Sequence, residues 1–498
     1  MWLKNIQVYD PIFQQYDGCC VHIDNHLITE LLPTHPTRLS QETVLDLKDH
    51  YLYPGFIDSH CHLLSFGASL LEKNLFDTSA PSCWFEIMQT DTRDVLIYRG
   101  WSEDIIGYTP TKQLLDSIGI DKPILLTRKC GHAGVVNTKT LQTFSLNQYN
   151  QVDGTDLSTG FLTEKALSSL HQQIPTSQVS LEISLKAAYR ACRKFGICSA
   201  HSEDCSISNM EAIIPLLRTS PLHLHEKILV NSPEEMDQVI DFCKKYPDTD
   251  TFSFGSFKIY MDGSLGAHNA NLSHPYSDKP NQHGFSFYTT DELIDFIQSA
   301  NHHSKQLAIH VIGDQALEKC IQAFEYVASR SESKITHRLI HVQMASSDQL
   351  SRIKKLPLII NLQPVFAEAD QQMAVLRLGA ARLADIGYPF HSIAMNNIPF
   401  SLSSDTPVET MNPFLILSHA ERFMSRKEAF FAYTVAGAKQ SHFPNPLGVL
   451  KPGSYADGFI LPFDLFTLTP EQLAKIIPSH LLSNGEIYTL NTTTREIG

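Results

Sequence analysis

The segment YPGFIDSHCH, residues 53–62, decides the fold that the rest of the chain is expected to adopt. After Tyr53 comes a Pro-Gly pair and then a short apolar stretch. His60 and His62 stand two positions apart at the end of the segment. Side chains at positions i and i+2 of a strand project from the same face, so both imidazoles can reach one metal ion. We therefore predict a buried strand that ends in two metal ligands, with Asp58 able to orient one ring. The alternative is a pair of histidines in a polar loop. If the strand alternation holds, Cys61 is expected to pack on the opposite face.

Four further apolar segments end in a side chain that can take part in chemistry. They are GSFKIYMDG with Lys258, QLAIHVIGD with His310, HRLIHVQ with His341, and PFSLSSD with Asp405. Amphipathic patterns separate these segments, which is typical of βα units around a parallel sheet. A barrel of about 250 residues has about 31 residues per unit, and His310 and His341 lie 31 apart (341 − 310). Because a (β/α)8 barrel carries its active site at the carboxyl ends of its strands, we predict such a barrel with these side chains at one rim.

Each of these residues also has an ordinary structural explanation. A single histidine at the end of an apolar strand is more often a hydrogen-bonded core residue than a ligand, and Asp405 could cap the following helix. The spacing of two such histidines downstream of an HxH pair favours a shared metal site. His201, in SAHSED, also follows a strand-like run, but we do not assign it as a ligand.

The two ends of the chain have a different pattern from the middle. Residues 1–54 and 447–498 contain short alternating segments between turn residues, which predicts a small β-sandwich domain formed by both ends. The hydrolase barrel would then occupy residues 55–446. The 196 residues between the HxH pair and the lysine (258 − 62) are too many for three βα units. We therefore expect an insertion after the first barrel strand, at about 70–170.

Composition excludes several classes of protein. Of the 498 residues, 43% are hydrophobic and 18% are charged, so the chain can bury a large core. The net charge is -14, and no basic stripe predicts a nucleic-acid partner. We find no secretory signal and no apolar run of the roughly 20 residues that a membrane span needs. The ten cysteines are scattered, which favours reduced thiols and a cytoplasmic location, and the oligomeric state is left open although homodimers are the commonest assembly.

Ordered blocks of sequence along nearly the whole chain carry a resemblance to a known family. They are PGFIDSHCH, GHAGVVN, TGFLTEKAL, KIYMDGSLGA, AIHVIGDQAL, RLIHVQ, LQPVFAEAD, SSDTPVE, AYTVAGA and GVLKPGSYADG. With these blocks the chain resembles the amidohydrolase superfamily, and within it amidohydrolase family 3, which includes N-substituted formamide deformylases. It departs from the usual GWD and DGH of relatives, with GWS at 100–102 and CGH at 130–132, and its stretch before the HxH pair is short. The first two departures concern the substrate pocket and not the metal ligands.

The resemblance implies one or two divalent ions, most commonly Zn2+, and assigns their ligands. His60 and His62 would bind the more buried ion, and His310 and His341 the second. Asp405 would contact the first ion and the hydrolytic water. With one ion only, the ligand set would be that of a mononuclear deaminase, without His341.

Lys258 matches a lysine that is carbamylated in many relatives and then bridges two ions. An unmodified lysine is a cation and a poor neighbour for a dication, whereas a carbamate supplies two anionic oxygens. The alternative is an unmodified Lys258 in an ion pair with Asp262 or with a carboxylate of the substrate.

Further residues are expected around the metal ligands. His132, Asn137, Asp262 and Gln363 are predicted to contact substrate. Asp58, Asp314 and Arg338 are predicted to hold the ligands in place, although they could equally form salt bridges at the rim.

The predicted activity is hydrolysis of a C–N bond in a small amide, formamide or cyclic amide, with Asp405 as general acid and base. The same chemistry would also cleave an ester or a lactone. The alternative from another class is a metal-binding barrel that has a regulatory role and no turnover. A serine nucleophile is not predicted, because GTDLSTG (154–160) does not fit the nucleophile-elbow pattern.

Overall fold

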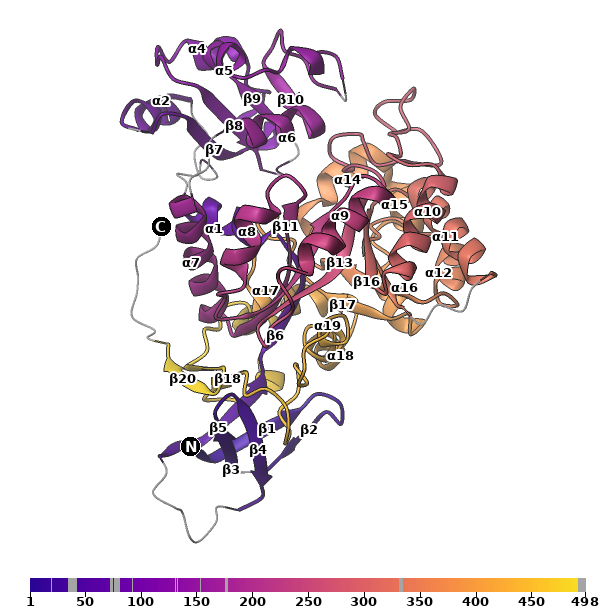
Figure 1. The fold of residues 1–498 in the computed structure, drawn as a ribbon. Coiled ribbons are helices and arrows are strands. Elements are labelled where there is room, and N and C mark those ends of the chain that lie inside the picture. Colours follow the sequence, from indigo (N-terminus) through magenta and orange to yellow (C-terminus); the bar gives the residue numbers. More distant parts are fainter. Residues whose placement is uncertain are drawn as a thin grey trace. The chain divides into compact units, whose positions relative to one another are not determined.

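The computed structural model describes most of the chain, in two compact units. The described residues are 1–18, 20–34, 43–71, 75, 81–91, 93–129, 131, 133–152, 154–174, 178–330 and 335–490. The first unit contains residues 1–63 and 189–498, and the second contains residues 64–188. A barrel and a sheet built from both chain ends belong to the first unit, and a smaller sheet belongs to the second (Figure 1).

Eight parallel strands of the first unit form the barrel. In spatial order they are β6 (Phe56–Cys61), β11 (Ile197–Ser206), β12 (His223–Leu229), β13 (Phe252–Tyr260), β14 (Gln306–Val311), β15 (His337–His341), β16 (Leu358–Leu362) and β17 (Phe400–Leu402). All seven neighbouring pairs run parallel. Their residues are almost all buried, since helices cover the outer face and side chains fill the interior. The (β/α)8 barrel predicted from the sequence is therefore confirmed.

The residues that follow the first and last barrel strands close the cylinder. The amide of Asp405 donates a hydrogen bond to the carbonyl of His60 (2.9 Å), and the amide of His62 donates to the carbonyl of Thr406 (2.8 Å). Closure therefore takes place at the rim that carries the HxH pair, and it fixes the backbone of that pair.

Helices follow the barrel strands, and local capping signals mark where several of them begin. They are α8 (Met210–Leu217), α9 (Pro233–Cys243), α10 (Thr290–His302), α11 (Asp314–Ala328), α12 (Ser347–Ile353), α13 (Phe366–Ala369), α14 (Gln371–Leu378), α15 (Ala380–Ile386), α16 (Phe390–Met395), α17 (Pro413–Ala420), α18 (Arg426–Ala432) and α19 (Val435–Ala438). Thr289 and Glu292 form a capping box at the start of α10, and Ser346 and Gln349 form one at α12. These side chains satisfy backbone N–H groups that the first helical turn leaves unpaired.

Both ends of the chain contribute strands to one eight-stranded sheet. The amino-terminal strands are β1 (Trp2–Asp10), β2 (Gln15–Asp17), β3 (Cys20–Asp24), β4 (Leu27–Leu32) and β5 (Val44–Pro54); the carboxyl-terminal strands are β18 (Gly458–Leu461), β19 (His480–Ser483) and β20 (Glu486–Thr489). The spatial order is β20-β19-β18-β5-β1-β3-β4, with β2 on β1. The 3-10 helix η2 (Leu465–Thr467) and α20 (Pro470–Leu473) lie between β18 and β19 in the chain. The two ends thus pair, as the sequence predicts, within a continuous sheet whose apolar core includes Leu52 and Ile460.

Gly55 connects this sheet to the barrel, because it is the single residue between β5 and β6. A Cβ atom at this position would lie 2.3 Å from Sγ of Cys198. Its amide donates to the carbonyl of Asp457 at 3.0 Å. The glycine before the HxH strand is therefore required by a close approach of the backbone to its neighbours.

The second unit contains the insertion predicted after the first barrel strand. Its sheet has the order β10-β9-β8-β7, with β7 (Leu96–Trp101) parallel to β8 (Ile124–Arg128), and with β9 (Ala133–Val136) and β10 (Phe161–Thr163) antiparallel to their neighbours. The helices of this part of the chain are α1 (Leu63–Leu71), α2 (Pro81–Gln89), α3 (Glu103–Ile106), α4 (Lys112–Asp116), α5 (Thr138–Thr143), η1 (Asn147–Tyr149), α6 (Glu164–Gln173) and α7 (Gln178–Lys194). Trp84, Tyr98 and Trp101 are buried in its core. Across the described residues, no helix combines the length and the apolar character that crossing a membrane requires.

His337, at the start of β15, predicts that part of the stability depends on pH. Its Nδ1 accepts the amide of Leu307 (3.0 Å), its Nε2 faces Oδ1 of Asn301 (3.1 Å), and burial lowers its pKa to about 4. At a pH below the usual histidine pKa of about 6.5, His337 is protonated in the unfolded chain but stays neutral in the folded chain. The free energy of unfolding therefore falls as the pH falls toward 4. Between pH 7.5 and pH 5 this histidine should account for a loss of about 2 kcal/mol in the free energy of unfolding.

Urea unfolding of the wild type and of H337Q at both pH values measures this contribution. The pH-dependent loss should be smaller in H337Q by that amount, whereas H302Q, at an exposed histidine of α10, should behave as the wild type does. Equal losses in H337Q and the wild type would show that His337 does not make this contribution.

Candidate metal centre

The proposed ligands lie at or just beyond the carboxyl ends of barrel strands. His60 lies in β6, Lys258 in β13, His310 in β14 and His341 at the end of β15, while His62 and Asp405 follow β6 and β17. All of them except His62, which is partly exposed, are buried. Since parallel strands end at the same rim, the fold gathers residues that are far apart in the sequence.

Asp405, which follows the last barrel strand, contacts both histidines of the HxH pair. Its Oδ1 lies 3.0 Å from Nε2 of His60 and 3.4 Å from Nε2 of His62. Its backbone has a φ of 57°, and that of His341 has a φ of 79°. Residues other than glycine rarely adopt positive φ, although Asp and His do so more readily than most, and such positions cluster at functional sites.

His341 completes a compact group with these residues. Ligand atoms of His60, His341 and Asp405 all lie within 4.8 Å of one another. Nδ1 of His341 lies 2.9 Å from Oε1 of Gln363, which can only accept, so Nδ1 carries the proton and Nε2 keeps a free lone pair. The ring of His310 lies 4.6 Å from that of His341 between centroids, with Nε2 directed at the carbonyl of Gly263 (3.5 Å).

Burial sets the protonation of these side chains. It lowers the pKa of His341 to about 4, and together with the charge of Lys227 it holds the pKa of His60 well below its usual value. Burial alone would raise the pKa of Asp405, but hydrogen bonds from His60 and His62 outweigh it and keep that pKa well below its usual range. At neutral pH the site therefore presents an ionised carboxylate and, at His60 and His341, neutral imidazoles, which are the forms that bind metals.

This set of side chains fits a divalent ion such as Zn2+. Zinc sites are built from imidazole nitrogens and carboxylate oxygens, and both kinds of atom meet here. In addition, Nδ1 of His60 is buried and has no hydrogen-bond partner in the structure. A buried polar atom without a partner is costly, so its presence next to the ligand group indicates a functional arrangement.

Lys258 is paired with Glu203, a residue that the sequence analysis did not assign. Nζ of Lys258 lies 2.5 Å from Oε2 of Glu203, and the hydroxyl of Tyr260 donates to Oε1 at 2.7 Å. Burial would raise the pKa of Glu203, but the charge of Lys258 outweighs this effect and lowers the pKa overall. Asp262, which the alternative of an unmodified lysine named as its partner, is not the carboxylate that Lys258 contacts. The position of Glu203 two residues after His201, in a strand-like run, was the available signal.

Asp262 and Asp314 fix the loops around the rim. Asp262 accepts the amides of Ile312 (3.0 Å) and Gly313 (2.8 Å) after β14, and burial raises its pKa to about 7. Asp314 accepts the amide of Ser273 at 3.0 Å. The structure thus places both carboxylates on backbone amides beside the centre.

Asp58 and Arg338 lie beneath the ligands, within the barrel. Asp58 accepts the amide of Ser404 at 3.0 Å, next to Asp405 in the chain. Arg338 is fully buried and donates to Nδ1 of His201 and to Nε2 of His225, both at 2.8 Å. His201 is therefore engaged in this deeper network and does not join the ligand group.

Asn137 and His132 were predicted from GHAGVVN to contact substrate. His132 lies outside the described residues. Asn137 is the N-cap of α5, where its side chain accepts the amides of Thr140 (2.9 Å) and Ile124 (3.0 Å) and donates to the carbonyl of Lys122 (2.9 Å). Its amide group thus links the start of α5 to the start of β8, and a contact with substrate stays a prediction.

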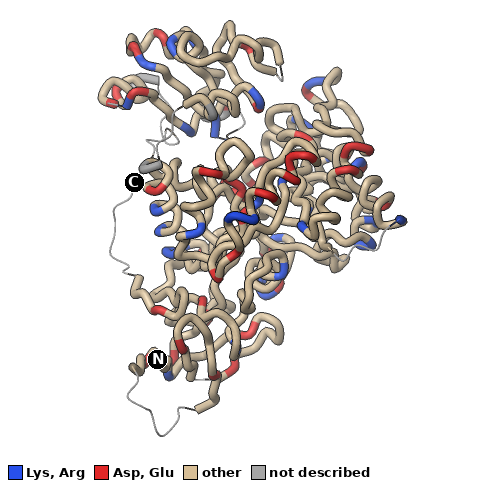
Figure 2. The backbone as a smooth tube through the Cα atoms, viewed as in Figure 1, with Lys and Arg blue, Asp and Glu red and all other residues tan. Residues whose placement is uncertain are grey.

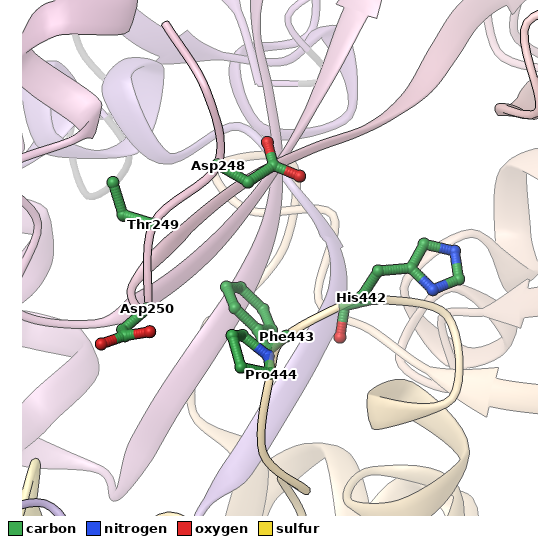
Figure 3. A pocket seen from close by; sticks show the side chains of 7 residues that line it. Asp248, Thr249, Asp250, His442, Phe443 and Pro444 are labelled. Atoms are coloured by element: carbon green, nitrogen blue, oxygen red, sulfur yellow. The ribbon is translucent and has the colours of Figure 1, made fainter.

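A pocket of about 440 Å³ lies away from these ligands, and Figure 3 shows the side chains that line it. It is lined by Asp248, Thr249, Asp250, Ser441, His442, Phe443 and Pro444. Residues 248–250 precede β13, and residues 441–444 follow α19. This pocket therefore belongs to the amino-terminal rim and is separate from the metal centre.

Sequence and structure are both similar to those of proteins that are described as hydrolases. The family model described as "Amidohydrolase family" matches residues 43–488. "Putative amidohydrolase YtcJ" of Bacillus subtilis (strain 168) is 28% identical over 484 residues, which cover 89% of this chain and 90% of that protein. The N-substituted formamide deformylase of Arthrobacter pascens is 22% identical over 473 residues, which cover 84% and 85%. An uncharacterized metal-dependent hydrolase from Pyrococcus horikoshii OT3 has a similar crystal structure, with a TM-score of 0.80, 26% identity, and coverage of 94% of this chain and 99% of that chain.

The contact between His341 and Gln363 gives a test of the centre. Removing the amide in Q363A frees the ring to rotate and removes the acceptor that fixes its proton on Nδ1. The affinity for Zn2+, measured by competition with a chelating dye, should fall about 10- to 100-fold. Q349A removes another buried glutamine side chain, from the capping box of α12, and should leave the affinity unchanged. Equal affinities in both variants would contradict the assigned role of Gln363.

Proposed function

Because this chain belongs to the amidohydrolase family, we propose that it is a metal-dependent hydrolase that cleaves a C–N bond in a small amide, formamide or cyclic amide. One observation carries the proposal: a single oxygen of Asp405 lies within 3.4 Å of both HxH imidazoles, at the rim where His310 and His341 lie at the carboxyl ends of their strands. A barrel rim of this composition is equipped to bind metal and to move a proton.

We propose Zn2+ as the ion, in one or two copies. His60, His62 and Asp405 would hold one ion, and His310 and His341 would hold a second. When bound, such an ion would supply Lewis acidity. It would lower the pKa of a water molecule enough for hydroxide, which can attack a carbonyl, to form near neutral pH.

Asp405 is proposed to move the proton. It is buried and ionised, and closure of the barrel through its amide fixes its position. It would accept the proton of the attacking water and return it to the leaving nitrogen, because an amine leaves readily only once it is protonated. An ester or a lactone has a better leaving group and needs less of this help, so hydrolysis of such substrates is the alternative reaction at the same rim.

The state of Lys258 separates a two-ion centre from a one-ion centre. A carbamate on Nζ would supply two anionic oxygens to bridge a pair of ions. An unmodified lysine would instead keep the ion pair with Glu203, and the centre would then hold one ion, as in a deaminase. Counting ions per chain, with mass analysis for the added mass of a carbamate, distinguishes these alternatives.

We propose a small-molecule substrate and a cytoplasmic location. Basic and acidic residues are mixed along the described chain, without a long run of one sign (Figure 2), so a nucleic-acid partner is not favoured. The eight cysteines that the structure describes are all free thiols, as expected in a reducing compartment.

A hydrolysis screen tests the proposed function. N-formyl, N-acyl and cyclic amides, with esters and lactones alongside, are incubated with the protein and Zn2+ or Mn2+. We expect turnover of at least one C–N substrate, and loss of it after the metal is removed with a chelator. D405N should lower kcat/KM by about 10²- to 10⁴-fold, because general acid–base catalysis contributes that much. D348N changes an exposed carboxylate of α12 and should retain activity. Full turnover by D405N would show that another group carries the proton.

A further inference from the structure

Glu203 is a buried carboxylate at the metal centre, placed there by an irregularity of its strand. In the pairing of β11 with β12, Ser202 faces Glu226 but the next paired residue is Cys205, which faces Ile228. Two residues of β11 thus stand opposite one residue of β12. Such a bulge redirects side chains, and here it accompanies a carboxylate that lies against residues of β6 and β13.

Both oxygens of Glu203 have identified neighbours. Oε1 accepts the hydroxyl of Tyr260 at 2.7 Å. Oε2 lies 2.5 Å from Nζ of Lys258 and 3.6 Å from Nδ1 of His60. Tyr260 and Lys258 therefore hold the carboxylate from the β13 side, and its second oxygen is directed between Lys258 and His60.

His60 lacks a partner on the side that faces Glu203. Its Nε2 is directed at Asp405, 3.0 Å away, while Nδ1 is buried without a hydrogen bond. A histidine that binds a metal through one nitrogen usually donates the N–H of the other, most often to a carboxylate or a carbonyl. Moving Oε2 from 3.6 Å to a hydrogen-bond distance requires a shift of only about 0.8 Å.

We propose that Glu203 is a positioning residue of the metal centre, which accepts the Nδ1–H of His60 and so directs the Nε2 lone pair of that ring to the ion. The proposal rests on the function proposed above, because it requires that His60 is a metal ligand. Tyr260 and Lys258 keep the carboxylate in place, and Glu203 in turn keeps His60 in the tautomer and the orientation that bind metal.

The test measures Zn2+ affinity by dye competition in the wild type and in four variants: E203A, E203Q, H60Q and the double variant E203A/H60Q. E203A should lower the affinity about 10- to 100-fold. E203Q keeps an oxygen that can accept the N–H but loses the charge, so its affinity should lie between those of E203A and the wild type. In the H60Q background the further change E203A should have little effect, because Glu203 acts through the ring that is already missing.

A matched control separates the positioning of His60 from the replacement of any buried carboxyl group. Glu226 on β12 is as deeply buried, and its Oε1 accepts the amides of Asp204 and Cys205, a task that glutamine can also perform. E226Q should retain wild-type affinity. The absorption spectrum of the Co2+-loaded protein provides a second readout, which should change in E203A and E203Q but not in E226Q.

The outcomes distinguish this proposal from the proposed function. Wild-type protein that binds no metal would contradict the function itself. If the wild type binds metal and E203A binds it equally well, only the role of Glu203 is overturned. An effect of E203A that persists undiminished in the H60Q background would also overturn it, because Glu203 would then act through another residue. Should E203A fail to fold, E203Q decides: affinity and Co2+ spectrum identical to those of the wild type would contradict the proposal.

Discussion

The hydrogen bond from the amide of Asp405 to the carbonyl of His60 is the interaction on which the rest of the centre depends. It closes the barrel between the first and last strands, and it also brings the Asp405 carboxylate to the imidazole of His60. The same two residues therefore close the barrel and bring the candidate ligands together. A rim in which these two segments were not joined would leave the HxH pair without its carboxylate.

Burial and neighbouring charges then determine the protonation state of the side chains at the centre. Removal from water favours the neutral imidazoles of His60 and His341, whereas hydrogen bonds to Asp405 and the charge of Lys258 beside Glu203 keep these carboxylates ionised. A buried carboxylate is costly unless it is paired. The cost is offset here by contacts with the groups that a bound ion would need, namely His60 and Lys258. The barrel thus buries two ionised carboxylates, Asp405 and Glu203, which the packing of its core does not need.

The sequence was sufficient to predict the barrel and the gathering of residues at its rim, because strand spacing and the HxH alternation follow local rules. Glu203 could not be found in this way. Its strand contains an irregular register, so simple alternation does not tell which residues of SAHSED face the centre. Asn137 shows the opposite case, since the motif drew attention to substrate while the local sequence Asn137-x-x-Thr140 already permitted an ordinary helix cap. Contacts between distant strands, such as Lys258 with Glu203, depend on barrel geometry that no short window of sequence contains.

The most direct test of the account is anomalous diffraction at the zinc absorption edge from crystals grown with Zn2+. The account predicts an ion at the carboxyl rim within about 2.0–2.2 Å of the HxH imidazole nitrogens and of the Asp405 carboxylate. Ordered density in which these side chains surround no ion, with zinc bound only at surface carboxylates, would contradict it.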